Sequence, residues 1–540
     1  MQNQIIEGFR LSPQQKRLWS LQQDGFAYRT QCAILLEGKL KGEVLKEALQ
    51  RVVNRHEILR TTFHRRSGIK IPIQVIADSS TPSWHNVNLS DWDLSEQEAR
   101  IEELFQEEKR FIFNFEQGPL LRSSLLTLSA HQHILLVSLP SLCADGWTLK
   151  NLVQAISHAY AVCLKSEELS DEPIQYIQFS EWQNKILEGE DAETGRAYWR
   201  QQDLWAQHPL TIPFEGKPCG QKRFEPDVHA LRIYPDVVAK SEAIATLHNI
   251  TIAEFLFASW QTLLWRLTGQ PEIVISTVYS GRQYEELHGV LGLLAKWLPI
   301  RCTFNKYLKF PEVFSQISEA IRNTHKWQEY FLWKESTGSD GNIVKFPISF
   351  EFEEWPDNNC AGGVSFSVYN QYICFDQFKV KLTCVRREES LIAEFHYDTN
   401  LFCVEDIKRL ARQFQTLVES AANNPEATVN ELEILKRSDR QKLLIDFNNT
   451  QTDFPKDKCI HHLFEEQAER TPNNIAVVFE DQQLTYAELN ARANQLAHHL
   501  QRLGVQPEVS VALCVKRSLE MVIGLLGILK AGALCRMHRD

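Results

Sequence analysis

Apolar positions along this chain alternate between helical and strand-like spacing, which predicts a mixed α/β protein. Apolar residues three and four apart predict a helix over 43–56, and a longer helix is expected over 147–164. Alternating or continuous apolar runs predict strands over 30–36 and 70–77. The run over 133–139 is rich in Ile, Leu and Val, so we expect a buried central strand there.

A second set of helices and strands follows a polar segment with Pro and Gly, residues 207–226, which we interpret as a crossover or hinge loop. The elements on its two sides favour two α/β lobes, residues 1–180 and 181–435. A polar and charged segment over 436–458 indicates a linker. A new helix–strand alternation covers 459–540, and we expect it to stop before a parallel sheet could close.

Composition narrows the class of protein. Of 540 residues, 24 % are charged and 43 % are hydrophobic, which is globular and excludes disordered or collagen-like chains. The net charge of −11 disfavours nucleic-acid binding, which depends on Lys and Arg paired with phosphate. Twelve scattered cysteines without a C-x-x-C fit reduced cytosolic thiols. No signal peptide or bilayer-length segment is visible, so we expect a cytoplasmic protein without membrane partners.

Short motifs in a fixed order along the chain carry a family resemblance. Segment 12–19 resembles S-x-A-Q-x-R-L-W, and segment 55–63 closely matches R-H-E-x-L-R-T-x-F. Further matches lie at Tyr176, Phe179 and Trp182, at Gly281-Arg282, at 292–301 and 397–402, and in the tail at 460–467, 484–489 and 529–532. The chain resembles a nonribosomal peptide synthetase, with a condensation domain followed by the start of an adenylation domain.

The resemblance implies a two-lobed fold like that of chloramphenicol acetyltransferase, plus a partial N-terminal subdomain of an adenylate-forming enzyme. It implies acyl transfer, in which an acceptor amine attacks a donor thioester. Both substrates would arrive on phosphopantetheine arms of partner acyl or peptidyl carrier domains, through opposite mouths of a tunnel between the lobes. The chain itself would bind no cofactor, and a trans-acting tailoring enzyme is a further partner that we consider.

The family centre is H-H-x-x-x-D-G, in which the second histidine contacts the acceptor amine and acts as a base or orienter. Here the aligned segment is P-S-L-C-A-D-G, so Pro140 and Ser141 replace both histidines while Asp145 and Gly146 remain. Pro140 offers no donor, and Ser141 would itself need a base for activation. We therefore expect reduced or atypical activity, with Ser141, Asp145 and Gly146 as the candidate catalytic residues.

Three histidines and one cysteine are candidates to replace the missing base or nucleophile. His133 lies eight residues before Ser141 on one predicted strand, about 26 Å away at 3.3 Å per residue, and is excluded. His288 and His325, from the second lobe, stay open. Cys143 is either an acyl-accepting thiol or a buried small hydrophobe, and we favour the second interpretation.

The resemblance also assigns residues that support the centre. Asp145 is expected to order its loop through an arginine, and Arg301 lies where that partner is expected. The alternative is that the two residues form separate ion pairs on separate surfaces. Trp147, which directly follows the motif, is assigned a supporting role as well.

Two other groups of residues belong to the motifs of the resemblance. Arg55, His56 and Arg60 lie on or just after a predicted helix, and we expect structural ion pairing or loop bracing from them. Lys296 and Trp297 replace the Asn-Thr of the family and place bulky side chains beside the tunnel.

The tail lacks the parts that adenylation needs, which are a Gly/Ser/Thr-rich loop for the ATP phosphates and a late lysine for the acyl-adenylate. We therefore expect an inactive adenylation fragment that does not use ATP. No L-G-G-x-S segment marks a carrier domain. We assign His461 and His462 to helix-start chemistry and expect no metal, because no further ligands have zinc spacing.

Three functional hypotheses stay open. The first is a condensation-type acyltransferase that forms amides or esters with a degenerate centre. The second is a non-catalytic condensation-like module that docks carrier proteins or a tailoring enzyme. The third is a truncated gene product without function, which the departure from the family pattern after Ala533 favours.

Overall fold

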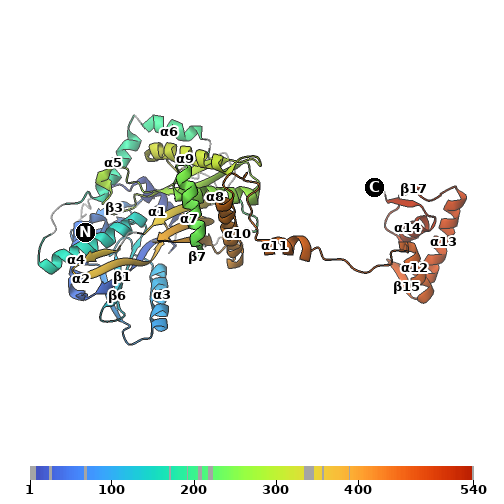
Figure 1. Ribbon diagram of the computed structural model, residues 1–540, viewed down its shortest axis with the longest axis horizontal. Helices are drawn as coiled ribbons and strands as arrows, with labels where there is room; N and C mark the ends of the chain where they lie inside the picture. Colours follow the sequence, from blue (N-terminus) through green and yellow to red (C-terminus); the bar gives the residue numbers. More distant parts are fainter. Residues whose placement is uncertain are drawn as a thin grey trace. The chain divides into compact units, whose positions relative to one another are not determined.

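The chain folds into two compact units, residues 1–441 and 442–540, which are described separately (Figure 1). The computed structural model describes residues 8–22, 27–65, 68, 70–168, 172–190, 192–202, 204, 210–216, 223–333, 346–355, 358–387 and 389–537. The predicted hinge loop lies partly outside the described residues, at 207–209 and 217–222.

Unit 1 alternates helices and strands, as the apolar pattern predicts. Its helices are α1 (Pro13–Leu21), α2 (Gly42–Arg55), α3 (Leu94–Arg110), α4 (Gly146–Lys165), α5 (Tyr176–Glu188), α6 (Ala192–Gln201), α7 (Pro235–Leu247), α8 (Ile252–Thr268), α9 (Phe310–Trp327), α10 (Val404–Asn423) and α11 (Arg437–Gln441), with 3₁₀ turns η1 (Glu57–Arg60), η2 (Glu285–Leu287) and η3 (Gln328–Tyr330). Its strands are β1 (Arg29–Gly38), β2 (Thr61–His64), β3 (Ile73–Ile76), β4 (Ser83–Asn88), β5 (Arg122–Thr127), β6 (Gln132–Pro140), β7 (Pro226–Ile233), β8 (Glu272–Tyr279), β9 (Lys296–Thr303), β10 (Ile348–Glu354), β11 (Asn359–Ala361), β12 (Val364–Ile373), β13 (Val380–Arg387) and β14 (Ser390–Asp398).

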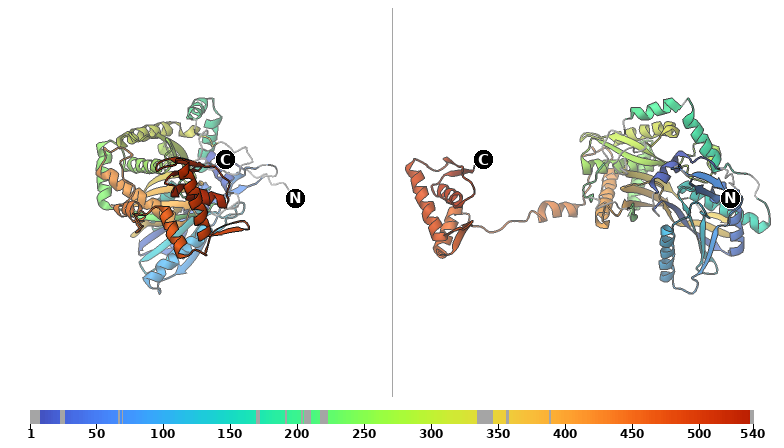
Figure 2. Two further views of the ribbon diagram at one scale, coloured as in Figure 1. Left: turned by 90° about the vertical axis from the view of Figure 1, so that its right-hand side faces the viewer. Right: turned by 180° about the vertical axis from the view of Figure 1, so that it is seen from behind.

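The first six-stranded sheet has the order β11-β12-β1-β6-β5-β4. The predicted strand over 133–139 is confirmed as β6, and it is antiparallel to its neighbours β1 and β5. On the other side of β1 lies β12, a strand from the second half of the chain, with Thr30 opposite Ile373. This gold strand runs among the blue strands of the first sheet (Figures 1 and 2). The two halves of unit 1 are therefore joined through the backbone of one sheet.

The second six-stranded sheet has the order β7-β14-β13-β10-β8-β9. Strand β10 is parallel to β8 and β13, whereas the other pairs are antiparallel, so the sheet is mixed. One face packs on α7–α10 through large apolar side chains such as Phe255, Trp260 and Phe414. Because side chains alternate along a strand, Ile348 and Phe350 enter this core while Ser349 and Glu351 face the other way.

The predicted helices over 43–56 and 147–164 are confirmed as α2 and α4. Helix α4 begins at Gly146 because the Asp145 carboxylate accepts a hydrogen bond from the Thr148 backbone N–H at 2.8 Å, which caps the first turn. The predicted strand over 70–77 is shorter than expected and spans only β3.

Unit 2 has a small core of its own. It contains a π-helical turn η4 (Lys442–Asp446), α12 (Ile460–Arg470), β15 (Ile475–Phe479), β16 (Gln482–Thr485), α13 (Tyr486–Arg502), β17 (Ser510–Leu513), α14 (Leu519–Lys530) and β18 (Leu534–Met537). Strands β15 and β16 form an antiparallel pair, and β17 and β18 a parallel pair. The buried core is centred on Leu484, Leu489, Ala493, Leu519 and Leu526.

The sequence predicts neither a membrane-spanning segment nor a disulfide framework. Among the described residues, no helix combines the length and the apolar character needed to cross a membrane. No disulfide joins the cysteines that the structure describes.

Candidate functional site

The segment that aligns with the family centre forms the turn between β6 and α4. Pro140 is the last residue of β6, opposite Arg29 of β1. Ser141 has no exposed surface. Its hydroxyl donates to the Cys374 carbonyl at 2.9 Å and lies 2.9 Å from the Thr30 hydroxyl. The Ser141 hydroxyl is therefore held by the Cys374 carbonyl and the Thr30 hydroxyl.

Cys143 lies in the same turn and is wholly buried. Burial raises the pKa of the Cys143 thiol well above its ordinary value. Since the thiolate is the nucleophilic form, burial and the raised pKa support the interpretation of Cys143 as a small core residue.

Asp145 accepts hydrogen bonds from four residues around it. One oxygen faces Thr148 at the start of α4, and the other accepts from the backbone N–H groups of Leu294 and Ala295, both at 2.9 Å. Arg282 approaches both oxygens, at 2.9 and 3.1 Å. The side chains of Arg282 and Asp145 are 3 % and 0 % exposed. Asp145 thus joins the start of α4 to both ends of the connection between β8 and β9.

The predicted pair between Asp145 and Arg301 is wrong, because Arg282 is the partner. Arg301 lies within β9, a third exposed, and its guanidinium is 3.9 Å from Glu272 of the neighbouring β8. Gly281 has φ +68°, and a Cβ there would lie 2.0 Å from a backbone oxygen of the segment before β9. This glycine turns the chain after β8 and directs Arg282 to Asp145. In the sequence, the Gly281-Arg282 motif was the feature that could have identified Arg282 as the partner of Asp145.

Gly146 and Trp147 form the first turn of α4. A Cβ on Gly146 would lie 3.0 Å from the Ile373 side chain of β12, so the start of α4 packs closely on the end of β12. Trp147 is half-buried against the first core. Both residues fix the position of the turn.

Arg55, His56 and Arg60 brace the junction between α2 and η1. The Arg55 carbonyl accepts a hydrogen bond from the Gln175 amide at 3.0 Å. The Arg60 guanidinium donates to the Ala77 carbonyl. His56 is buried, and this burial, with a smaller contribution from the charge of Arg55, lowers its pKa to about 4. A neutral buried imidazole is a packing residue at this position.

The other candidate histidines lie elsewhere in unit 1. His133 is near the start of β6, opposite Leu36, whereas the motif begins at the other end of the strand. His288 and His325 are both exposed. Within the part of the chain that the structure describes, no hydrogen bond connects any of these three histidines to Ser141.

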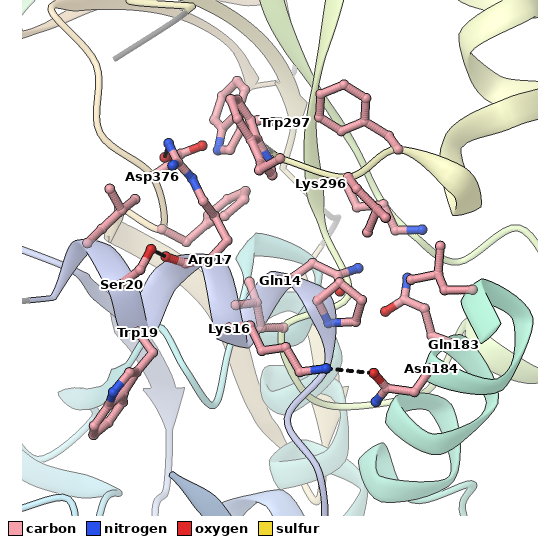
Figure 3. A pocket seen from close by; sticks show the side chains of 18 of the residues that line it. Gln14, Lys16, Arg17, Trp19, Ser20, Gln183, Asn184, Lys296, Trp297 and Asp376 are labelled. Carbon is pink, nitrogen blue, oxygen red and sulfur yellow. Dashed lines mark hydrogen bonds and ion pairs between the residues drawn. The ribbon is translucent and has the colours of Figure 1, made fainter. Parts of the chain in front are cut away.

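A cavity of about 1190 Å³ lies between the two halves of unit 1. Its walls come from α1, α5, the start of β9, the residues around η3, and Phe375-Asp376 (Figure 3). Lys296 and Trp297 both line it. Phe375 directly follows Cys374, whose carbonyl accepts a hydrogen bond from Ser141, so this wall adjoins the turn between β6 and α4.

Lys296 is buried, and its ammonium lies 2.5 Å from a Glu329 carboxylate oxygen that also accepts from the Gln183 amide at 3.0 Å. Burial lowers the pKa of Lys296. Trp297 stacks on Phe375 with ring centroids 5.5 Å apart. These two positions therefore form a rigid wall with one ion pair and one aromatic pair.

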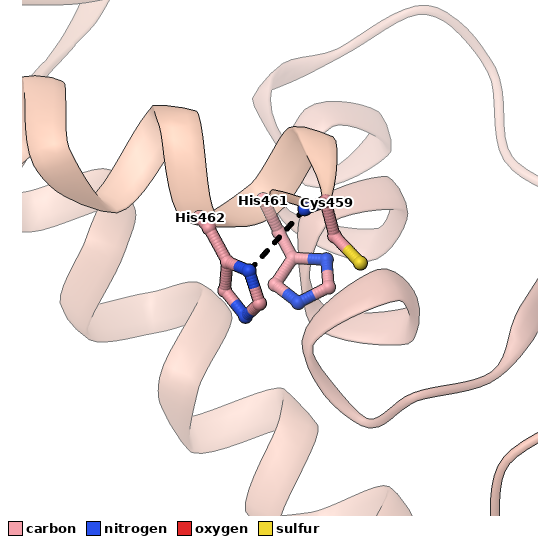
Figure 4. Close-up of side chains that lie close together, drawn as sticks. All are labelled: Cys459, His461 and His462. Atoms are coloured by element: carbon pink, nitrogen blue, oxygen red, sulfur yellow. Dashed lines mark hydrogen bonds between the residues drawn. The ribbon is translucent and has the colours of Figure 1, made fainter. Parts of the chain in front are cut away.

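Cys459, His461 and His462 lie together at the start of α12 in unit 2 (Figure 4). Their ligand atoms are within 4.8 Å of one another, and the chemistry of a thiol and two imidazoles suits a transition metal. The His462 Nδ1 atom accepts a hydrogen bond from the Cys459 backbone N–H at 3.3 Å. This bond supports the predicted helix-start role of His462, and the Cys459 thiol lies beside the two imidazoles at the same helix start.

Comparison with known families places both units. The model of the family described as "Condensation domain" matches residues 6–444. This chain belongs to the condensation-domain family. The model of the family described as "AMP-binding enzyme" matches residues 464–537. A condensation domain is therefore followed by a segment of an adenylation domain, and the resemblance to nonribosomal peptide synthetases is confirmed.

Curated relatives of this chain are large synthetases. The chain is 32 % identical over 530 residues to tyrocidine synthase 3 of Brevibacillus parabrevis, covering 96 % of this chain and 8 % of that relative. It is 31 % identical over 533 residues to bacitracin synthase 2 of Bacillus licheniformis, covering 97 % and 20 %. The chain thus spans a fifth or less of these two relatives.

Solved structures share the fold. The four-domain nonribosomal peptide synthetase AB3403, bound to AMP and glycine, matches with a TM-score of 0.80 at 18 % identity over 99 % of this chain and 42 % of that one. The first condensation domain of the CDA synthetase matches with a TM-score of 0.68 at 18 % identity, over 79 % and 99 %. The X-domain from teicoplanin biosynthesis, solved with OxyB, matches with a TM-score of 0.67 at 21 % identity, over 79 % and 96 %. The condensation fold of unit 1 is therefore established.

Proposed function

We propose that unit 1 binds carrier-delivered substrates and transfers an acyl group between them by positioning alone. An acceptor amine or hydroxyl would attack the carbonyl carbon of a donor thioester. The new C–N or C–O bond replaces the C–S bond, and the acceptor proton ends on the released thiol. The phosphopantetheine arms belong to partner acyl or peptidyl carrier domains, so the chain supplies no cofactor.

The observation that carries this proposal is an open cavity beside a centre without a base. The cavity holds about 1190 Å³, while Ser141 is fully buried with its hydroxyl bonded to the framework. Orientation of two reactants is worth effective molarities of about 10⁵–10⁸ M, whereas a lost general base costs about 10²–10⁴-fold. We therefore expect that positioning alone supports acyl transfer at a rate that is measurable but lower than with a general base.

The second candidate function is a docking module without chemistry. The complete burial of Ser141 favours it, because the aligned centre presents no reactive side chain to a substrate. The X-domain has the same fold, and its structure was solved in complex with OxyB. A carrier protein or a tailoring enzyme would be the partner of this chain under the second proposal.

Donor- and acceptor-loaded carrier proteins, with mass spectrometry of the condensed product, test the two functions. We expect product from the native chain and from Ser141→Ala, because this hydroxyl takes no part. Ser20→Trp adds bulk at an exposed cavity-lining position and is expected to abolish product. Ser90→Trp, at an exposed position outside the cavity lining, is the matched control and should leave the rate unchanged.

The alternative outcomes of this assay are distinct. Carrier or tailoring-enzyme binding without product would favour the docking module. Loss of product in Ser141→Ala, with unchanged melting, would contradict positioning catalysis and assign the chemistry to this hydroxyl.

We propose further that the AMP-binding segment of this chain does not activate substrates. Residues 464–537, which match the AMP-binding family, contain no Gly/Ser/Thr-rich sequence that could hold ATP phosphates at a nest of backbone N–H groups. ATP–pyrophosphate exchange with a panel of amino and hydroxy acids should stay at background. Robust exchange with any of them would overturn this assignment.

A further inference from the structure

The cavity of unit 1 has a positive lining in an acidic protein. Six basic and three acidic side chains line it, an excess of three positive charges. The whole chain carries −11. A cleft that gathers one sign of charge against the net charge of the molecule favours ligands of the opposite sign.

The three carboxylates in the lining already have cationic partners. Their pairs are Arg17–Asp376 at 3.2 Å, Lys296–Glu329 at 2.5 Å and Arg10–Glu188 at 2.5 Å. Four lining cations have no carboxylate within 4 Å among the described residues, and they are Lys16, Arg65, Lys70 and Arg196. The excess of positive charge is therefore not neutralised by the wall itself.

Among these four cations, Lys16 has the surroundings that best suit binding of an anion. It extends from α1 toward α5 and donates to the Asn184 amide oxygen at 2.8 Å (Figure 3). An amide satisfies one hydrogen-bond donor but does not balance the charge. Burial, and then the positive charge of Arg10, lower the pKa of Lys16. An anion beside Lys16 would relieve both effects, since it attracts the ammonium and restores its solvation.

We infer that the cavity binds an anionic group, a carboxylate or a phosphate, against the Lys16 ammonium. This inference rests on the proposed function, since the anion would belong to a carrier-delivered substrate. Two sources share this chemistry, which are an acidic side chain on the acceptor and the phosphate of the phosphopantetheine arm. The same lining would disfavour a basic acceptor side chain.

Four synthetic probes separate the two sources. They are leucyl-pantetheine amide and glutamyl-pantetheine amide, each with and without the 4′-phosphate. The α-amine is common to all four, so differences in Kd report only the side chain or the phosphate. Isothermal titration with the full chain should give about tenfold tighter binding for at least one anionic probe than for leucyl-pantetheine amide, a preference that falls with added salt.

Charge variants of Lys16 assign the preference. Lys16→Met should remove the tenfold preference and change the affinity for leucyl-pantetheine amide by less than twofold. Lys16→Arg keeps the charge and should retain the preference. Lys46→Met, at an exposed position of α2 that does not line the cavity, is the matched control. Melting temperatures of the three variants report whether folding is intact.

The possible outcomes distinguish failure of the anion site from failure of the proposed function. Equal affinity for all four probes would overturn the anion site but not the proposed function. No binding of any probe would overturn both. A preference that survives Lys16→Met would overturn the assignment to this residue. A phosphate-dependent gain identifies the arm as the anion, and a glutamyl-dependent gain identifies an acidic acceptor.

Discussion

One carboxylate, that of Asp145, holds three segments of unit 1 together. It caps α4 and binds Arg282 after β8, and it accepts two backbone N–H groups before β9. All of these contacts are buried, so the carboxylate has protein partners in place of water. The residue therefore organises the turn between β6 and α4 and the segments packed around it.

Asp145→Ala is expected to lower the free energy of unfolding by about 3–5 kcal/mol, because it leaves the buried Arg282 charge without its partner. Urea denaturation measures this change. Arg301→Ala is the matched control, since that arginine is a third exposed and 3.9 Å from Glu272, and should cost about 0–1 kcal/mol. Equal losses in the two variants would contradict the assignment of Arg282 as the structural partner.

Sequence spacing alone did not choose the correct arginine. Both Arg282 and Arg301 lie in motifs that carry the family resemblance. The choice depends on the turn at Gly281, which points Arg282 inward, and on the register of β9, which places Arg301 beside β8. Such a choice is made by folding in three dimensions and is not visible in a linear motif.

At the scale of elements, the junction of α2 and η1 depends on a neutral imidazole. His56 ends α2 and begins η1, and it is 6 % exposed. Its folded pKa of about 4 lies below the ordinary 6.5 of the unfolded chain. Between these pH values the unfolded chain binds a proton that the folded chain does not, so stability falls as the pH decreases from 6.5 to 4.

His56→Gln is expected to flatten this part of the pH profile. The native chain should lose about 3 kcal/mol more than the variant between pH 7 and pH 4, from about 1.4 kcal/mol per pKa unit. Denaturation at each pH gives both curves. Parallel curves for the two proteins would show that His56 is charged in the folded state and that this account of the junction is wrong.

The start of α12 gives a second prediction at this scale. Its thiol and two imidazoles have ligand atoms up to 4.8 Å apart, wider than the about 3.5 Å between neighbouring ligands of tetrahedral zinc. We therefore expect equimolar Zn²⁺ to leave the melting temperature of the full chain unchanged. A rise in melting temperature that Cys459→Ser removes would establish a metal site and contradict the helix-start interpretation.

At the scale of the whole molecule, the chain has two units with separate cores. The described residues of unit 1 form two large buried apolar clusters and a smaller one, whereas the described core of unit 2 centres on five buried residues. Since buried apolar area is the main source of stability, the smaller core is expected to melt at the lower temperature.

Matched core substitutions test this separation by calorimetry. Leu489→Ala in unit 2 should shift only the lower transition, and Leu410→Ala in unit 1 should shift only the upper one. Each change should cost about 2–5 kcal/mol in its own unit, from lost burial and the cavity left behind. A single transition that both variants shift equally would show that the units unfold together.

The sequence by itself determined the family, the order of the domains, helices α2 and α4, strand β6 and the presence of Pro140 and Ser141 in the aligned motif, because motifs and apolar periodicity are local properties. The tertiary structure decided which groups meet. It paired β12 with β1 across more than three hundred residues, selected Arg282 for Asp145, and buried the hydroxyl of Ser141 against Cys374. It also gathered basic side chains from distant segments around one cavity. These contacts depend on register and packing between distant parts of the chain, which no single segment encodes.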